Sequence, residues 1–142
     1  FAAAFAAAFY ANENPALQFY FTAPYYYTDG SDFAGVLTAF FFVFICSLLF
    51  FGKSAPIALG IEGLKYASLF FAKAIPAYDL LYAIPEIIAA YSATVLGAGA
   101  LGDFKGTANV FDYWREGAKY FLVALILTGI IFLARPYLVL SL

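Results

Sequence analysis

Residues 33–52 read FAGVLTAFFFVFICSLLFFG, a run of twenty residues without a charged side chain. Asp32 precedes the run and Lys53 follows it. At 1.5 Å per residue, a helix of this length measures about 30 Å, the thickness of the hydrocarbon core of a bilayer. Residues 40–44 are apolar on every face of such a helix, so we expect lipid to surround much of it. The run predicts a transmembrane helix.

The composition of the whole chain favours the same class of protein. Of its 142 residues, 65% are hydrophobic and 11% are charged, whereas a soluble domain is about half apolar and about one quarter charged. A water-soluble fold of this size could not bury so much apolar surface. We therefore predict an all-α integral membrane protein with an Ala/Phe- and Tyr-rich interfacial segment at 1–32 and a transmembrane helical domain at 33–142.

Two further apolar stretches predict transmembrane helices at about 80–102 and 118–140. The first contains one charged residue, Glu86. In the second, the neutral run between Lys119 and Arg135 is shorter than the hydrocarbon core, so the flanking charges must snorkel or the helix must continue beyond them. We expect Arg135 to act as an interfacial anchor at the membrane surface.

A helix near residues 60–76 has a different character, because its charges are too frequent for a helix that faces lipid. Glu62, Lys65 and Lys73 fall on one arc of the helix, opposite an apolar face. This pattern predicts an amphipathic helix that lies in the membrane interface. The alternative is a span buried among partner subunits, with its charges paired.

Small residues recur at every fourth position of the second predicted span. They form two adjacent stripes, Ala89, Ala93 and Gly97, and Ala90, Thr94 and Ala98. Small residues at this spacing let helix backbones approach closely in lipid. We expect this span to be the one most enclosed by other protein, either the third span or a partner chain.

Aromatic residues flank the predicted spans. Tyr25, Tyr26 and Tyr27 precede the first span, and Trp114 precedes the third. Their rings suit the headgroup layer, so these residues are candidate interfacial anchors; an aromatic loop packed on a neighbouring protein is the alternative. Basic residues follow the first span and none precedes it, which by the positive-inside rule places the N-terminal segment on the outer or lumenal side.

The residue types that are missing exclude most catalytic chemistry. Without histidine there is no His-ligated haem, no His metal site and no Ser-His-Asp triad, and Cys46 alone cannot form a cluster. The spacing of glycines at 97–102 resembles a nucleotide-binding loop, but no strand precedes it. No basic run supports nucleic-acid binding. We therefore predict no catalytic site, no metal and no cofactor of the chain's own; its aromatic rings could contact lipid, carotenoid or chlorophyll.

Glu86 is the one candidate for intramembrane chemistry. An ionisable side chain within a span costs about 2.5 kcal/mol or more and is by default a functional hypothesis. The structural interpretation is that Glu86 lies near the end of the span and reaches water or a partner's Arg. The position of Glu86 near the end of the span favours the structural interpretation over the functional one.

The leading hypothesis is a non-catalytic accessory subunit of a large bioenergetic membrane complex, photosynthetic or respiratory. Its partners would be other membrane subunits and lipids, in an organellar or bacterial energy-transducing membrane such as the thylakoid or mitochondrial inner membrane. The alternative is a small transporter or channel that uses Glu86. The chain contains no Met, even at position 1, so we expect it to have been processed or trimmed. Alternatively some Phe and Leu occupy positions of His and Met, which peptide mass spectrometry would show.

Overall fold

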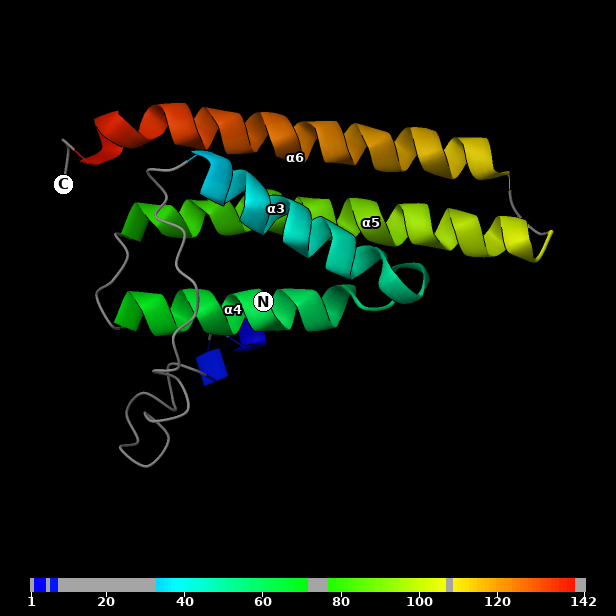
Figure 1. Ribbon diagram of the computed structural model, residues 1–142, viewed down its shortest axis with the longest axis horizontal. Helices are drawn as coiled ribbons and strands as arrows, with labels where there is room; N and C mark the ends of the chain where they lie inside the picture. Colours follow the sequence, from blue (N-terminus) through cyan, green and yellow to red (C-terminus); the bar gives the residue numbers. More distant parts are fainter. Residues whose placement is uncertain (1, 5, 8–32, 72–76, 107–108, 140–142) are drawn as a thin grey trace.

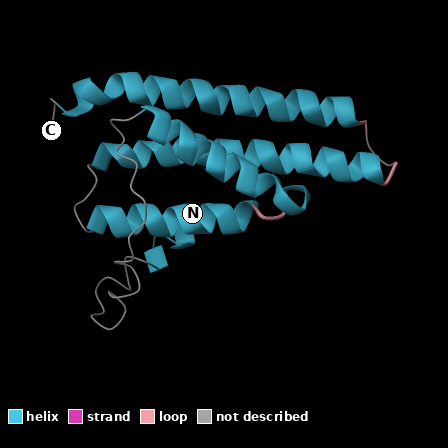
Figure 2. Ribbon diagram, viewed as in Figure 1, coloured by secondary structure: helices cyan, strands magenta, loops and turns pink. Residues whose placement is uncertain are grey.

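The computed structural model describes residues 2–4, 6–7, 33–71, 77–106 and 109–139, and in these residues every regular element is a helix (Figure 2). Two short elements, η1 and η2, are 3-10 helices, and the others are α-helices. In chain order the main elements are α3 (Phe33–Leu48), η1 (Leu49–Gly52), α4 (Ala55–Phe71), η2 (Ala77–Tyr82), α5 (Ala83–Phe104) and α6 (Val110–Val139).

Three of these helical segments are long and apolar enough to cross a membrane, as the sequence predicts. They are Phe33–Gly52, Tyr78–Phe104 and Val110–Leu138. The last begins earlier than the predicted start at 118, because Asn109 caps the helix: its Oδ1 accepts a hydrogen bond from the backbone N–H of Phe111 at 3.2 Å. The polar residues that follow therefore form the exposed first turns of α6 rather than a loop.

The helices α3 and α6 run in opposite directions. The ring of Phe33, at the start of α3, lies 4.8 Å from that of Phe132, near the end of α6. The ring of Phe44, near the end of α3, lies 4.7 Å from that of Phe121. The start of α3 and the end of α6 are therefore at the same end of the molecule (Figure 1). Three crossings would have placed them at opposite ends.

Helix α4 supplies the additional reversal of direction. Near its end Tyr66 packs in one cluster with Val36 of α3, and at its start Ala55 packs in another with Val43. It is thus antiparallel to α3, and it lies alongside α5 (Figure 1). Within the chain, α4 therefore packs along other helices. The prediction of an interfacial helix near 60–76 and its alternative, a span buried among partner subunits, both concern surroundings outside the chain and stay predictions.

The core of the bundle forms around α5. Phe40 of α3, Ala89 of α5 and Ala124 of α6 meet in one buried cluster. Of the most apolar 18 residues in Tyr78–Phe104, the segment that contains α5, 50% are buried. The corresponding shares are 28% in Phe33–Gly52 and 11% in Val110–Leu138. The small-residue stripes predict this enclosure, because alanine and glycine let the neighbouring helices approach the α5 backbone.

Helix α5 is also approached closely by the turn that ends α3. Phe50 and Phe51 have φ angles of 52° and 58°, and Gly52 has a φ of 84°, all in the left-handed region. This conformation brings the turn against α5, where a Cβ atom at Gly97 would lie 2.5 Å from the backbone nitrogen of Gly52. Only glycine at position 97 leaves room for the turn.

Candidate functional site

A cluster of ionisable and phenolic side chains is buried at the end of the bundle that holds the start of α3. Helix α4 contributes Glu62, Lys65 and Tyr66; η2 and the start of α5 contribute Tyr78, Asp79, Tyr82 and Glu86; and α6 contributes Arg135. We refer to these eight residues as the buried polar cluster. The structure thus brings together residues from three segments that are up to 73 positions apart in the sequence.

Helical spacing explains why these side chains meet. Glu62 and Tyr66 are four residues apart, so they share one face of α4. Asp79, Tyr82 and Glu86 follow one another at spacings of three and four on the opposing element. Pro85 lies in the first turn of α5, where a missing N–H disrupts no helical hydrogen bond, so the helix starts cleanly beside Glu86.

Glu86 lies at the centre of the cluster and is only 3% exposed. Its Oε1 accepts a hydrogen bond from the hydroxyl of Tyr66 at 3.0 Å. Its Oε2 is buried and has no hydrogen-bond partner among the described residues. Within the described part of the chain, Glu86 thus contacts a phenol, and the prediction that it reaches water or a partner's Arg is not tested by a single chain. The Tyr66 hydroxyl donates to Oε1 of Glu86, and Oε2 can accept from another donor.

An ion pair within α4 lies next to this carboxyl group. The Nζ of Lys65 is 2.8 Å from Oε2 of Glu62, and Glu62 is almost completely buried. Both residues are close enough to interact electrostatically with Glu86. The charges of α4 therefore point into the bundle, whereas the exposed side of the helix carries Ile57 and Ile61. This is the opposite of the orientation that the interfacial prediction required.

A second ion pair ties α6 to the segment before α5. The Nε of Arg135 is 3.4 Å from Oδ1 of Asp79, and its guanidinium group stacks over the ring of Tyr78. Asp79 is buried, and the Arg135 side chain is only 17% exposed. The predicted role of Arg135 as an interfacial anchor stays a prediction, and within the chain the residue is directed towards a buried carboxylate.

The described residues of the cluster include three carboxyl groups and two cations. Each cation forms an ion pair with a carboxylate, Lys65 with Glu62 and Arg135 with Asp79. The carboxyl group of Glu86 takes part in neither of these ion pairs and accepts a hydrogen bond from the Tyr66 hydroxyl. An unpaired charge is costly in such a place. No group of three potential metal ligands occurs in the described part of the chain.

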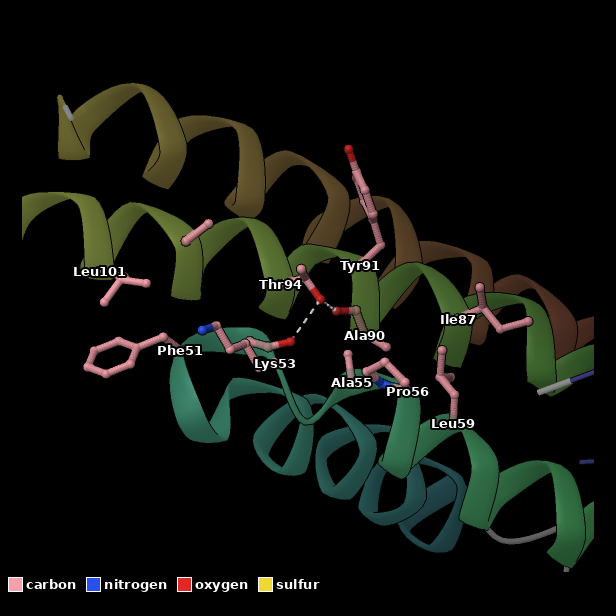
Figure 3. A pocket seen from close by; sticks show the side chains of 12 residues that line it. Phe51, Lys53, Ala55, Pro56, Leu59, Ile87, Ala90, Tyr91, Thr94 and Leu101 are labelled. Carbon is pink, nitrogen blue, oxygen red and sulfur yellow. Dashed lines mark hydrogen bonds between the residues drawn. The ribbon is translucent and has the colours of Figure 1, made fainter. Parts of the chain in front are cut away.

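The small residues of α5 serve packing, with one exception. Ala89, Ala90, Ala93 and Gly97 are buried against α3, η1 and α6. Thr94 is partly buried, and its hydroxyl donates to the carbonyl of Ala90. Ala98 is exposed and instead lines a groove of about 750 Å³ beside the start of α4 (Figure 3).

The predicted interfacial anchors are placed only in part. Tyr25, Tyr26 and Tyr27 lie outside the described residues. Trp114 is exposed on α6 and borders a second, smaller cavity of about 450 Å³. The exposed side chain suits an anchor, but no membrane is present to test that role.

Several residues of the buried polar cluster were not predicted to form a site. Glu62 and Lys65 were expected on a water-facing arc, and no role was predicted for Tyr66 or Tyr82. The spacing of Glu62 and Tyr66 signals a shared face, but not which way that face points. Only the contact with α5 determines that the face is internal.

Comparison of the chain with protein-family models, with curated proteins and with solved structures finds no match.

Proposed function

We propose that the chain is an integral membrane protein that serves as a non-catalytic structural subunit of a larger membrane assembly. The distribution of polarity supports the membrane location. Glu62, Asp79 and Glu86 are buried, while large apolar side chains are exposed on α3, α4, α5 and α6. Lipid is the solvent that suits an apolar exterior around a polar interior.

The outer face of α6 is the observation that carries the subunit role. This helix packs mainly on α5, and its outer side exposes a stripe at spacings of three and four that comprises Leu122, Ile126, Ile130, Leu133 and Tyr137. Gly129 beside the stripe has open space around it. The small-residue face of α5 is already occupied within the chain, so α6 is the surface that remains for a partner helix.

The assembly that we propose is a bioenergetic one, photosynthetic or respiratory, in an organellar or bacterial energy-transducing membrane. Only the composition supports this choice: few charges, many aromatic residues and no catalytic constellation. Isolation of the tagged chain in mild detergent, with identification of the proteins that accompany it, tests both the subunit role and the assembly.

The expected result is a particle many times heavier than 15.5 kDa. Ile126→Ala on α6 should release the chain from that particle, because it removes a contact on the proposed partner face. Ile57→Ala is the matched control, since Ile57 is equally exposed but lies on α4. A chain that migrates alone, or release by both variants alike, would refute the subunit role.

We also propose that α4 crosses the membrane as a fourth segment. It has 17 residues, about 25 Å of helix, and it runs along the bundle. Four crossings place Lys53 and Lys105 on the same side, whereas three crossings with an interfacial helix place them on opposite sides. Single cysteines at these positions, in a chain with Cys46→Ala, can be tested with a membrane-impermeant maleimide. Labelling of both from one side supports four crossings, and labelling from opposite sides contradicts them.

A transporter or channel that uses Glu86 is the second candidate. It is favoured by the buried Oε2 of that residue, which has no hydrogen-bond partner in the described part of the chain. The rest of the core offers little continuation. Beyond Glu86 the buried residues of α5 are mostly alanine and glycine, and the hydroxyls of Ser92 and Thr94 donate to backbone carbonyls. Proton flux into liposomes that contain the purified chain tests this role. Flux abolished by Glu86→Gln, with the protein still folded, would favour the transporter over the subunit.

A further inference from the structure

The groove beside the start of α4 is enclosed by three parts of the chain. The turn η1 and the first residues of α4 form one wall, and the outer face of α5 forms the other (Figure 3). Its lining is chiefly apolar and includes Phe51, Leu59, Ile87 and Leu101. The volume of about 750 Å³ is within the range of small-molecule binding sites.

Very few polar groups in this groove are available to a ligand. The hydroxyl of Thr94 donates to the carbonyl of Ala90 at 2.9 Å and approaches that of Gly52 at 3.4 Å. Lys53 lines the groove, is exposed, and forms no ion pair with the described residues. The groove therefore combines an apolar wall with one unpaired cation.

The position of Lys53 relates this groove to the membrane proposed above. Lys53 directly follows the apolar segment Phe33–Gly52, so it lies at headgroup level if that segment spans the bilayer. The lining residues of α5 extend from Ile87 to Leu101, about 21 Å along the helix. Gly52, which precedes Lys53, packs against Thr94, and Thr94 is seven residues, or about 10 Å, from Ile87 along α5. One leaflet of the hydrocarbon core is about 15 Å thick, so an acyl chain that descends from Lys53 can lie along this part of the groove.

We propose that the groove binds one anionic phospholipid, with its phosphate at Lys53 and one acyl chain against α5. The inference rests on the proposed membrane location and not on the subunit role. A net negative headgroup complements the unpaired ammonium group, whereas a zwitterionic headgroup brings its own cation. The occupant is a lipid because the groove opens on the same apolar exterior that lipid would cover.

Native mass spectrometry of the detergent-purified chain tests this site, with phosphatidylglycerol and phosphatidylcholine of equal chain length added in turn. We expect one retained phosphatidylglycerol and weaker retention of phosphatidylcholine. Lys53→Gln should weaken retention of phosphatidylglycerol about five-fold, which corresponds to about 1 kcal/mol for a basic residue near an anionic headgroup. Ala98→Phe should fill the groove and reduce retention of both lipids.

Two matched variants make the test specific. Lys105→Gln removes another exposed lysine at the same end of the bundle, and Ala100→Phe fills the second cavity, where no lysine is present. Both should retain phosphatidylglycerol as the unmodified chain does. Equal retention of the two lipids, or equal effects of Lys53→Gln and Lys105→Gln, would overturn the proposal.

Membrane insertion is measured separately, by resistance of the chain to alkaline carbonate extraction. Extraction of the chain would refute the membrane location itself. An inserted chain that retains no lipid would refute only the lipid site. A diazirine on the acyl chain adds a second measurement, because cross-links should map to the part of α5 between Ile87 and Thr94.

Discussion

The close approach of η1 to α5 makes Gly97 a sensitive position even for a methyl group. In Gly97→Ala the new Cβ would lie 2.5 Å from the backbone nitrogen of Gly52 and 2.6 Å from the backbone oxygen of Phe51. Backbone atoms cannot rotate away as the end of a side chain can. The turn must therefore move off α5, and we expect the variant to be destabilised.

Gly129 provides a matched reference for the size of this effect. It also lies within a helix, but a Cβ there would meet nothing within 4 Å. Replacing glycine by alanine in a helix gains about 1 kcal/mol of propensity at either position. Overpacking costs about 1–3 kcal/mol and applies only to Gly97. Gly97→Ala should therefore be less stable than Gly129→Ala by about 1–3 kcal/mol.

Trp114 gives a direct assay, because it is the only tryptophan and lines a cavity together with Phe51 and Gly97. Its fluorescence, followed during denaturation of the protein in mixed micelles by sodium dodecyl sulfate, reports the free energy of unfolding. Gly129→Ala should match or exceed the stability of the unmodified chain. If Gly97→Ala is stabilised as much as Gly129→Ala, then η1 does not pack on α5 as described.

Four further variants test the buried polar contacts. Tyr66→Phe leaves the Glu86 carboxyl group without its hydrogen-bond donor and should cost about 1–3 kcal/mol of stability. Glu86→Gln retains an acceptor, so its free energy of unfolding should be close to that of the unmodified chain. Equal losses of stability for the two variants would contradict the assigned hydrogen bond. Ser92→Ala removes a buried hydrogen bond of 2.7 Å to the carbonyl of Gly117 on α6 and should cost about 0.6 kcal/mol by the same micelle titration, the average for such bonds between membrane helices. Arg135→Gln removes the ion pair that joins α6 to η2 and should lower the melting temperature; no change would show that the pair is not formed in the protein.

The sequence alone predicted the helical class and the three apolar segments well, because these depend on local composition. The charge-free run at 33–52 reappears as Phe33–Gly52. The enclosure of α5 was also predictable, since alanine and glycine at a spacing of four signal close helix packing whatever the neighbour is. The third span was named as a possible neighbour, and α6 is the helix that packs most extensively on α5. The approach of η1 to Gly97 was not predictable, because its left-handed residues include two phenylalanines, which give no sequence signal for this conformation.

The sequence did not predict the direction in which the polar faces of the helices point, and the reason is physical. A helical arc of charges looks the same in sequence whether it faces water or a buried partner. For Glu62 and Lys65 the deciding factor was α5, which offers Glu86 opposite them. For Arg135 it was Asp79, which lies fifty-six residues away in the sequence. Long-range pairing of this kind leaves no trace in local periodicity.

The burial of the α4 charges against α5 has a consequence for biosynthesis. A charged residue near the centre of a helix adds about 2.5–3.5 kcal/mol to the free energy of insertion from the translocon. The ion pair between Glu62 and Lys65 reduces this cost, but Glu86 emerges from the ribosome more than twenty residues after Lys65. If α4 crosses the membrane as proposed above, its polar face therefore has no partner on α5 when it is first exposed to the lateral gate. We then expect α4 to wait in the aqueous channel and to enter the lipid together with α5 as a helical hairpin.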